Sequence, residues 1–178
     1  MYAETGKDRI RLQEDTDILD IDYEGRFNSS QGNALFKIEL MRSNGQNAIS
    51  EVELPLNFTI LSPSDDIDIK YNQLITVLFD GVDTDSKTEF VVDFICDNKL
   101  GGTFSGTSSH QLESTSNFSF SLSELQLIES ANSENYKNCE LDLTVNRYRV
   151  GNISDKFAVP SHIRAEQTRK IENITFTF

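Results

Sequence analysis

Hydrophobic and polar residues alternate with a period of two along much of the chain, which is the pattern of strands that place one face on a core. In residues 52–60 (VELPLNFTI) every second side chain is apolar, which predicts one long half-buried strand. Pro55 cannot donate a backbone hydrogen bond, so we expect a sheet edge or a bulge there. The same alternation recurs around residues 19–23, 36–40, 67–71, 118–122 and 174–178. Residues 74–79 (LITVLF) are apolar on both faces and predict a central strand covered on each side.

These segments predict an all-β protein: a single antiparallel β-sandwich of about nine or ten strands over residues 1–178, of jelly-roll or immunoglobulin-like type. Polar stretches separate the strands, among them residues 96–110 (CDNKLGGTFSGTSSH), which favour a hairpin turn or a long connection. Residues 1–16 are interpreted as a flexible arm.

The sequence predicts at most one short helix. It would occupy residues 122–131 (LSELQLIESA), with Ser123 as the N-cap and Gln126 closing a capping box, and a continued strand is the alternative. Residues 161–170 carry helix-forming residues without an apolar stripe, and a loop is equally favoured there.

The chain contains two cysteines, and both lie on the apolar side of an alternating segment. Cys96 ends FVVDFIC and Cys139 begins CELDLTV, so both thiols are expected to face the core. We predict a Cys96–Cys139 disulfide between facing or neighbouring sheets; two buried free thiols are the alternative. A disulfide implies an oxidising location: periplasm, cell surface or secretion. The N-terminus lacks the apolar core of a signal peptide, so export requires that this peptide has been removed.

Charge and hydropathy exclude two classes of partner. Sixteen basic residues face 29 acidic ones, and the net charge of −13 repels a phosphate backbone, so no nucleic-acid partner is expected. The uninterrupted apolar runs are only a few residues long, so no membrane-spanning helix is expected either.

A search for catalytic motifs identifies none. The Gly-x-Ser-x-Gly elbow, the phosphate-binding loop and the Ser-x-x-Lys and His-Glu-x-x-His patterns are all absent from the sequence. Both histidines, His110 and His162, are interpreted as loop residues. Acidic residues are so numerous that spacing alone selects no acid/base pair. We therefore predict no catalytic residues and no enzyme activity, although carboxylates that meet only in the fold remain the alternative.

Two groups of residues are candidates for ligand binding. Asp80, Asp83, Asp85 and Glu89 lie in the acidic loop DGVDTDSKTE, and carboxylates of this kind bind calcium; a solvated turn is the alternative, and no other cofactor is expected. The second group is Tyr148 with its neighbours Arg147 and Arg149. The alternation from Cys139 to Val145 places Tyr148 on the outer face, where it would contact a ligand or cap the end of the strand.

The function we expect is a non-catalytic exported module that binds a surface ligand, a glycan or a protein, or that mediates adhesion. The alternative is a structural subunit of a surface fibre, capsid or tail. That alternative rests on residues 170–178 (KIENITFTF), an aromatic strand at the end of the chain of the kind used in assembly by strand addition.

Overall fold

The structure is a computed structural model, and it describes residues 1–16, 21–27, 31–113, 115–125 and 135–178. It is all-β, with several antiparallel sheets, which confirms the predicted fold class and is consistent with a β-sandwich. The chain divides into two compact units: unit 1 comprises residues 1–57 and 148–167, and unit 2 comprises residues 58–147 and 168–178. The prediction of a single domain stays a prediction.

Unit 1 is built on a four-stranded sheet in the order β2-β1-β5-β6. Its strands are β1 (Tyr2–Thr5), β2 (Asp8–Arg11), β5 (Leu35–Leu40) and β6 (Ala48–Glu53), and β3 (Gln13–Thr16) forms a separate antiparallel pair with β4 (Ile21–Glu24). The interpretation of residues 1–16 as a flexible arm is therefore wrong, because β1 pairs with both β2 and β5.

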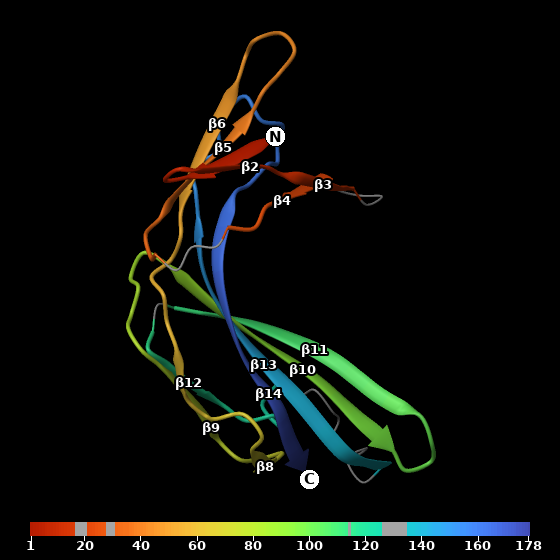
Figure 1. Cartoon of the computed structure of the whole chain (residues 1–178). Helices are drawn as coiled ribbons and strands as arrows, with labels where there is room; N and C mark the ends of the chain where they lie inside the picture. The colour runs from red at the N-terminus through yellow and green to blue at the C-terminus, as the bar shows by residue number, and fades with distance from the viewer. Residues whose placement is uncertain (17–20, 28–30, 114, 126–134) are drawn as a thin grey trace. The chain divides into compact units, whose positions relative to one another are not determined.

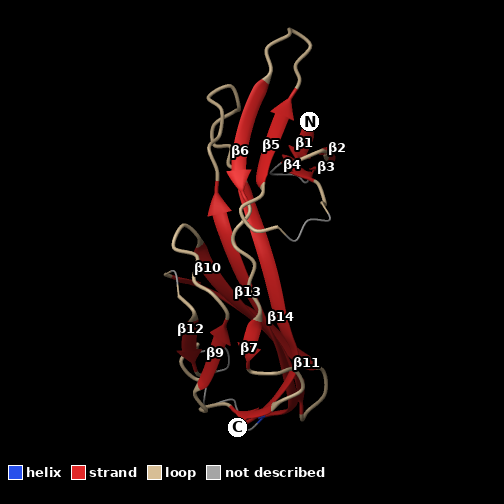
Figure 2. Cartoon of the chain, turned by 60° about the vertical axis from the view of Figure 1, so that its left-hand side comes forward, coloured by secondary structure: helices blue, strands red, loops and turns tan. Residues whose placement is uncertain are grey.

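Unit 2 contains two sheets that enclose one hydrophobic core. The larger has the order β11-β10-β13-β14-β8, and the smaller has the order β12-β9-β7 (Figures 1 and 2). The bounds are β7 (Ile60–Ser62), β8 (Asp68–Lys70), β9 (Ile75–Phe79), β10 (Lys87–Asn98), β11 (Thr103–Leu112), β12 (Asn117–Phe120), β13 (Tyr136–Val150) and β14 (Arg164–Thr177). Residues 148–150 at the end of β13 and residues 164–167 at the start of β14 belong to unit 1. Alternate residues of β9, β10, β12 and β13 supply most of the core, as the period of two requires.

Two predicted strands differ from the structure because of local chemistry. The long strand over residues 52–60 is interrupted: β6 ends at Glu53 and β7 begins at Ile60. Pro55 lies in this gap. Proline has no backbone N–H, so within a strand it would leave one position of the hydrogen-bond ladder without a donor. The segment 74–79 does form the central strand of its sheet, but it is covered on one face only, because Leu74 and Leu78 are exposed.

One segment interpreted as a hairpin turn or a long connection, and one interpreted as either a helix or a loop, are strands. Residues 103–112 form β11, which pairs with β10 without interruption from Thr88↔Leu112 to Asp97↔Thr103. Residues 164–170 belong to the 14-residue strand β14. Within β14, Ile171 and Ile174 are both buried although they are three residues apart, because Asn173 adopts a left-handed φ of 58° and inserts one extra residue.

The predicted helix begins as a turn two residues earlier than expected. Ser121 and Glu124 form the reciprocal pair of a capping box: the backbone N–H of Ser121 donates to Glu124 Oε2 (3.0 Å) and that of Glu124 donates to Ser121 Oγ (3.3 Å). Residues 122–125 form a turn, and the rest of the predicted helix, residues 126–131, lies outside the described part of the chain.

Candidate functional site

The two cysteines lie at disulfide distance inside unit 2, with their Sγ atoms 2.04 Å apart. Cys96 is on β10 and Cys139 on β13, which are adjacent strands of one sheet, so the pair does not link two sheets as expected. The Cα atoms are 4.1 Å apart, as for directly opposed residues on neighbouring strands. Both side chains are buried, as the alternation predicted.

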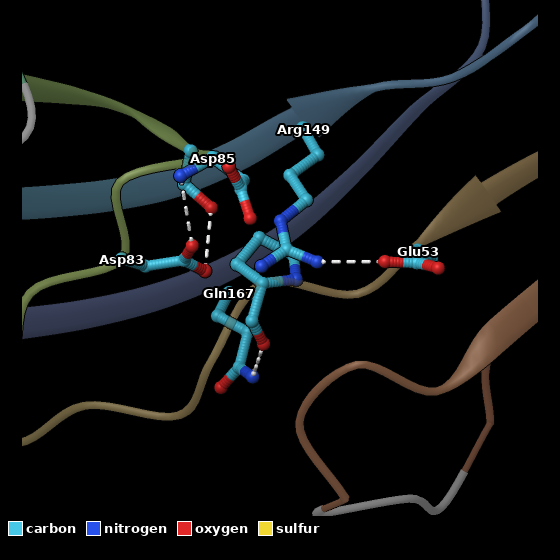
Figure 3. Close-up of polar contacts among 7 residues, drawn as sticks. Glu53, Asp83, Asp85, Arg149 and Gln167 are labelled. Carbon is cyan, nitrogen blue, oxygen red and sulfur yellow. Dashed lines mark hydrogen bonds and ion pairs between the residues drawn. The ribbon is translucent and has the colours of Figure 1, made fainter.

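The acidic loop between β9 and β10 is held by hydrogen bonds within the protein. Asp83 is only 4% exposed; its carboxylate accepts hydrogen bonds from Ser86 Oγ (2.7 Å) and from the backbone N–H of Asp85 (3.2 Å) (Figure 3). Asp80 accepts from the backbone N–H of Thr59, and Glu89 accepts from Ser109 Oγ (2.7 Å). The described residues hold no cluster of three or more His, Cys, Asp or Glu side chains that could bind a metal ion. The calcium site stays a prediction.

Arg147 was predicted to contact a ligand, and the structure buries it beside that acidic loop. Its guanidinium lies over the rings of Phe58 (4.6 Å to the centroid) and Phe79 (5.5 Å), and Nη2 donates to the carbonyl oxygen of Gly81 (2.9 Å). Desolvation lowers the pKa of Arg147, and the negative charges of Asp83 and Asp80 oppose that shift. Spacing in the sequence could not place this cation beside those carboxylates.

Tyr148 points away from the Arg147 face, as the alternation predicted, but it is not exposed as expected. It is only 5% exposed because the guanidinium of Arg164 covers its ring at 3.8 Å. Arg149 is partly buried and forms an ion pair with Glu53 (3.1 Å; Figure 3). All four of these side chains belong to unit 1, and Arg164 closes one face of the Tyr148 ring to a ligand.

His110 lies on a strand, which corrects its interpretation as a loop residue. Its Nε2 is 2.7 Å from Ser108 Oγ, and its ring stacks on Phe90 at 4.9 Å. Ser108 and His110 share one face of β11, two residues apart. The stacking on Phe90 accounts for the orientation of the histidine, since Phe90 belongs to the core of unit 2.

The aromatic end of the chain is an interior strand of its own sheet. β14 has β13 on one side and β8 on the other, where it pairs in parallel from Thr175↔Asp68 to Thr177↔Lys70. Phe176 is buried, and both Phe176 and Phe178 pack against Tyr71. Assembly through this strand stays a prediction, and it would require these contacts to be released.

Unit 1 forms a pocket of about 260 Å³, hereafter the apolar pocket, which no pattern in the sequence indicated. Its walls come from the start of the chain, the β2–β3 connection, β4, β5, β6, the connection between β13 and β14, and the start of β14. The lining residues are Met1, Leu12, Tyr23, Ile38, Ser50, Ile153, Phe157, Pro160, Ser161, His162, Ile163 and Arg164. Leu12, Ser50 and Ile163 are buried, whereas Tyr23, Ile153 and His162 are exposed. Only the fold brings these segments together, so no local motif could have identified the pocket.

One wall of the apolar pocket is formed by the residues that follow β13, and hydrogen bonds hold it in place. The backbone N–H of Ser154 donates to the buried Ser50 Oγ (2.9 Å), and the turn continues with Phe157 N–H donating to Ser154 O (3.0 Å). The backbones of Glu51 and Asn152 pair as an isolated antiparallel bridge. The pocket wall is therefore attached to β6, although it has no regular secondary structure of its own.

At the edge of the pocket, Tyr23 donates a hydrogen bond to Glu14 Oε2 (3.3 Å). Desolvation raises the pKa of Tyr23, and Glu14 adds to the rise through its charge and through this hydrogen bond. The phenol is therefore neutral at physiological pH, and the partly exposed side chain of Tyr23 lines the pocket.

Comparisons with known proteins identify no relative: no family model, curated protein or solved structure matches the chain. Among the described residues, no helix is long and apolar enough to span a membrane. Function must therefore be inferred from the geometry of the molecule itself.

Proposed function

We propose that the protein is a non-catalytic module of an extracytoplasmic compartment and that it binds another protein through the apolar pocket of unit 1. The observation that carries this proposal is the pocket itself, a concave site lined by apolar and aromatic side chains together with Ser50, Ser161, His162 and Arg164. This composition is typical of binding sites. The rigid support from Ser50 and Ser154 favours a preformed site over one that must order on binding.

The volume of the pocket suits one side chain inserted by a partner protein better than a whole drug-sized molecule. At about 260 Å³ it lies just below the range of roughly 300–1,000 Å³ that is usual for sites of drug-sized molecules. A single large side chain suits this volume, and protein interfaces are commonly dominated by one or two such anchors inserted into pockets. A glycan is less favoured, because Tyr148, its expected stacking platform, is covered by Arg164.

Charge and location narrow the class of partner further. The chain carries a net charge of −13, which favours partners with a neutral or basic contact surface. The cysteine pair at disulfide distance supports an oxidising compartment, where partners would be exported or surface proteins. We therefore expect the partner to insert an apolar side chain that is flanked by basic residues.

The test uses two variants that introduce the same charge at two exposed positions. Ile153 lines the apolar pocket and is 39% exposed, whereas Val159 lies in the same connection, is 95% exposed and is not part of the pocket lining. The wild type is screened against an array of extracellular proteins, and the affinity of Ile153→Glu and Val159→Glu for any hit is measured. We expect Ile153→Glu to weaken binding at least tenfold and Val159→Glu to retain it.

Two outcomes would contradict the proposal. If both variants bind as tightly as the wild type, the apolar pocket is not the contact site. If the folded wild type instead turns over ester, peptide or glycosidic substrates, the protein is an enzyme and the non-catalytic assignment fails.

A further inference from the structure

Strand β11 forms a long edge of the five-stranded sheet of unit 2. It contains ten residues and pairs with β10 on one side in unbroken register, and no other described strand pairs with it (Figure 1). Each of its residues is at least partly exposed. The outward N–H and C=O groups along such a strand are a ready template for another strand.

The other edge strands in the described part of the chain are short, charged or irregular, which are the usual protections against pairing with a second chain. β7 and β8 have three residues each, β12 has four, and the β7–β9 pairing is interrupted by a bulge. The remaining edges carry charge: Asp8, Arg9 and Arg11 on β2, Glu14 on β3, Glu24 on β4, and Glu51 and Glu53 on β6. β11 (TFSGTSSHQL) has no acidic or basic residue apart from His110, no proline and no register shift.

We propose that β11 is a dimerisation edge, along which two copies of this chain pair antiparallel and join their five-stranded sheets. A strand that pairs antiparallel with its own copy is related to it by a two-fold axis, so both partners use the same surface. Alternate residues of an antiparallel strand direct both backbone groups to one side, so ten residues supply up to about ten hydrogen bonds across the new pair.

The distribution of charge favours a second copy at this edge despite the net charge of −13 on each chain. Glu113 directly follows β11, so an antiparallel pair would place its two copies at opposite ends of the new strand pair. The other nearby acidic residues are Glu89, Asp93 and Asp97 on β10; Glu89 and Asp93 accept hydrogen bonds from Ser109 (2.7 Å) and Thr107 (2.6 Å) of β11. In the dimer, each β10 would be three strand spacings, about 14 Å, from its copy. This separation exceeds the Debye length of about 8 Å at physiological salt, so repulsion between these carboxylates is largely screened.

The decisive experiment compares two lysine variants of the full chain by sedimentation over a range of protein concentrations. Thr107→Lys puts a charge at the middle of the edge, where two copies would place like charges side by side, while in its own sheet it remains opposite Asp93. Leu100→Lys makes the same charge change in the adjoining β10–β11 turn, at a position that is 91% exposed. We expect the wild type and Leu100→Lys to form dimers and Thr107→Lys to remain monomeric.

Hydrogen exchange of the wild type provides a readout that requires no variant. Amides of residues 103–112 should become more protected as the protein concentration rises, and raising the salt concentration should increase the dimer fraction because it screens the net charge. The proposal is overturned if the wild type stays monomeric at every concentration. It is equally overturned if Thr107→Lys dimerises as the wild type does, or if exchange in residues 103–112 does not depend on concentration.

Discussion

Removal of the Cys96–Cys139 bond should destabilise unit 2 by an amount that follows from the length of the loop it closes. The two residues are 43 positions apart, and in the chain-entropy description a loop of that length restricts the unfolded chain by about 4 kcal/mol at 25 °C. For a protein of 150–250 residues this corresponds to a fall in melting temperature of about 8–16 °C. Because typical domains have only about 5–15 kcal/mol of stability, the loss is a large fraction of the total.

The assay is urea unfolding of three samples: the oxidised protein, the same protein reduced, and the variant with Cys96→Ala and Cys139→Ala. The chain has no tryptophan, so circular dichroism and tyrosine fluorescence are the suitable signals. The reduced protein keeps both buried sulfur atoms and loses only the cross-link, whereas the double variant loses both. The difference between these two samples therefore measures packing around the sulfurs, and the difference between oxidised and reduced protein measures the cross-link.

Alkylation followed by intact-mass measurement establishes whether the bond exists before stability is compared. Both thiols should resist alkylation in denaturant until a reductant is added. Immediate alkylation of the unfolded protein would refute the disulfide and with it the main support for an oxidising compartment. If the bond is present but the oxidised and reduced samples unfold within about 1 kcal/mol of each other, the loop-entropy reasoning is refuted.

Two further predictions concern unit 1. Gly151→Ala should lower stability by about 3 kcal/mol, because the added Cβ would lie 2.2 Å from the carbonyl oxygen of Glu51 and force the bridged backbones apart; thermal unfolding would measure the loss, and an unchanged melting temperature would contradict the close approach. The pKa of Tyr23 is raised in the folded state, so the neutral phenol is favoured and stability should fall as the pH rises from the unfolded value of 10.0 through the folded value. Absorbance at alkaline pH, taken as the difference between wild type and Tyr23→Phe, should show this late ionisation, and Glu14→Gln should move it to lower pH; a normal Tyr23 titration would contradict the interaction.

The sequence predicts strands well where side chains alternate and poorly where they do not. The β10 and β13 segments around the cysteines alternate strictly, and both are strands with the expected residues buried. β11 was missed because its serine, threonine and glycine residues resemble a turn in composition, although pairing with β10 makes them a strand. Its Gly106 is required by packing, since a Cβ there would lie 2.7 Å from the Phe94 ring, and not by a turn.

Candidate sites were harder to predict than strands because they depend on contacts between distant segments. The alternation correctly assigned Tyr148 to the other face of β13 from Cys139, Leu141, Leu143 and Val145, but it could not show that Arg164, 16 residues later, covers the ring. The apolar pocket likewise combines residues from both ends of the sequence of unit 1. Periodicity reports the environment within one strand, whereas a pocket depends on which strands become neighbours.

Arg147 is buried beside Asp80 and Asp83, so we predict that its guanidinium, and not calcium, is the cation that balances the charge of the acidic loop. The guanidinium already supplies positive charge to these carboxylates and is itself fixed by Gly81 O and two phenylalanine rings. Calcium or a chelator should therefore leave the melting temperature of the wild type unchanged. Arg147→Met removes that charge while filling most of the same space, so calcium should stabilise this variant more than the wild type; Arg147→Ala, which also leaves a void, should cost about 3 kcal/mol. A rise in the wild-type melting temperature with calcium would show that the loop binds the metal despite Arg147 and would restore the calcium site predicted from the sequence.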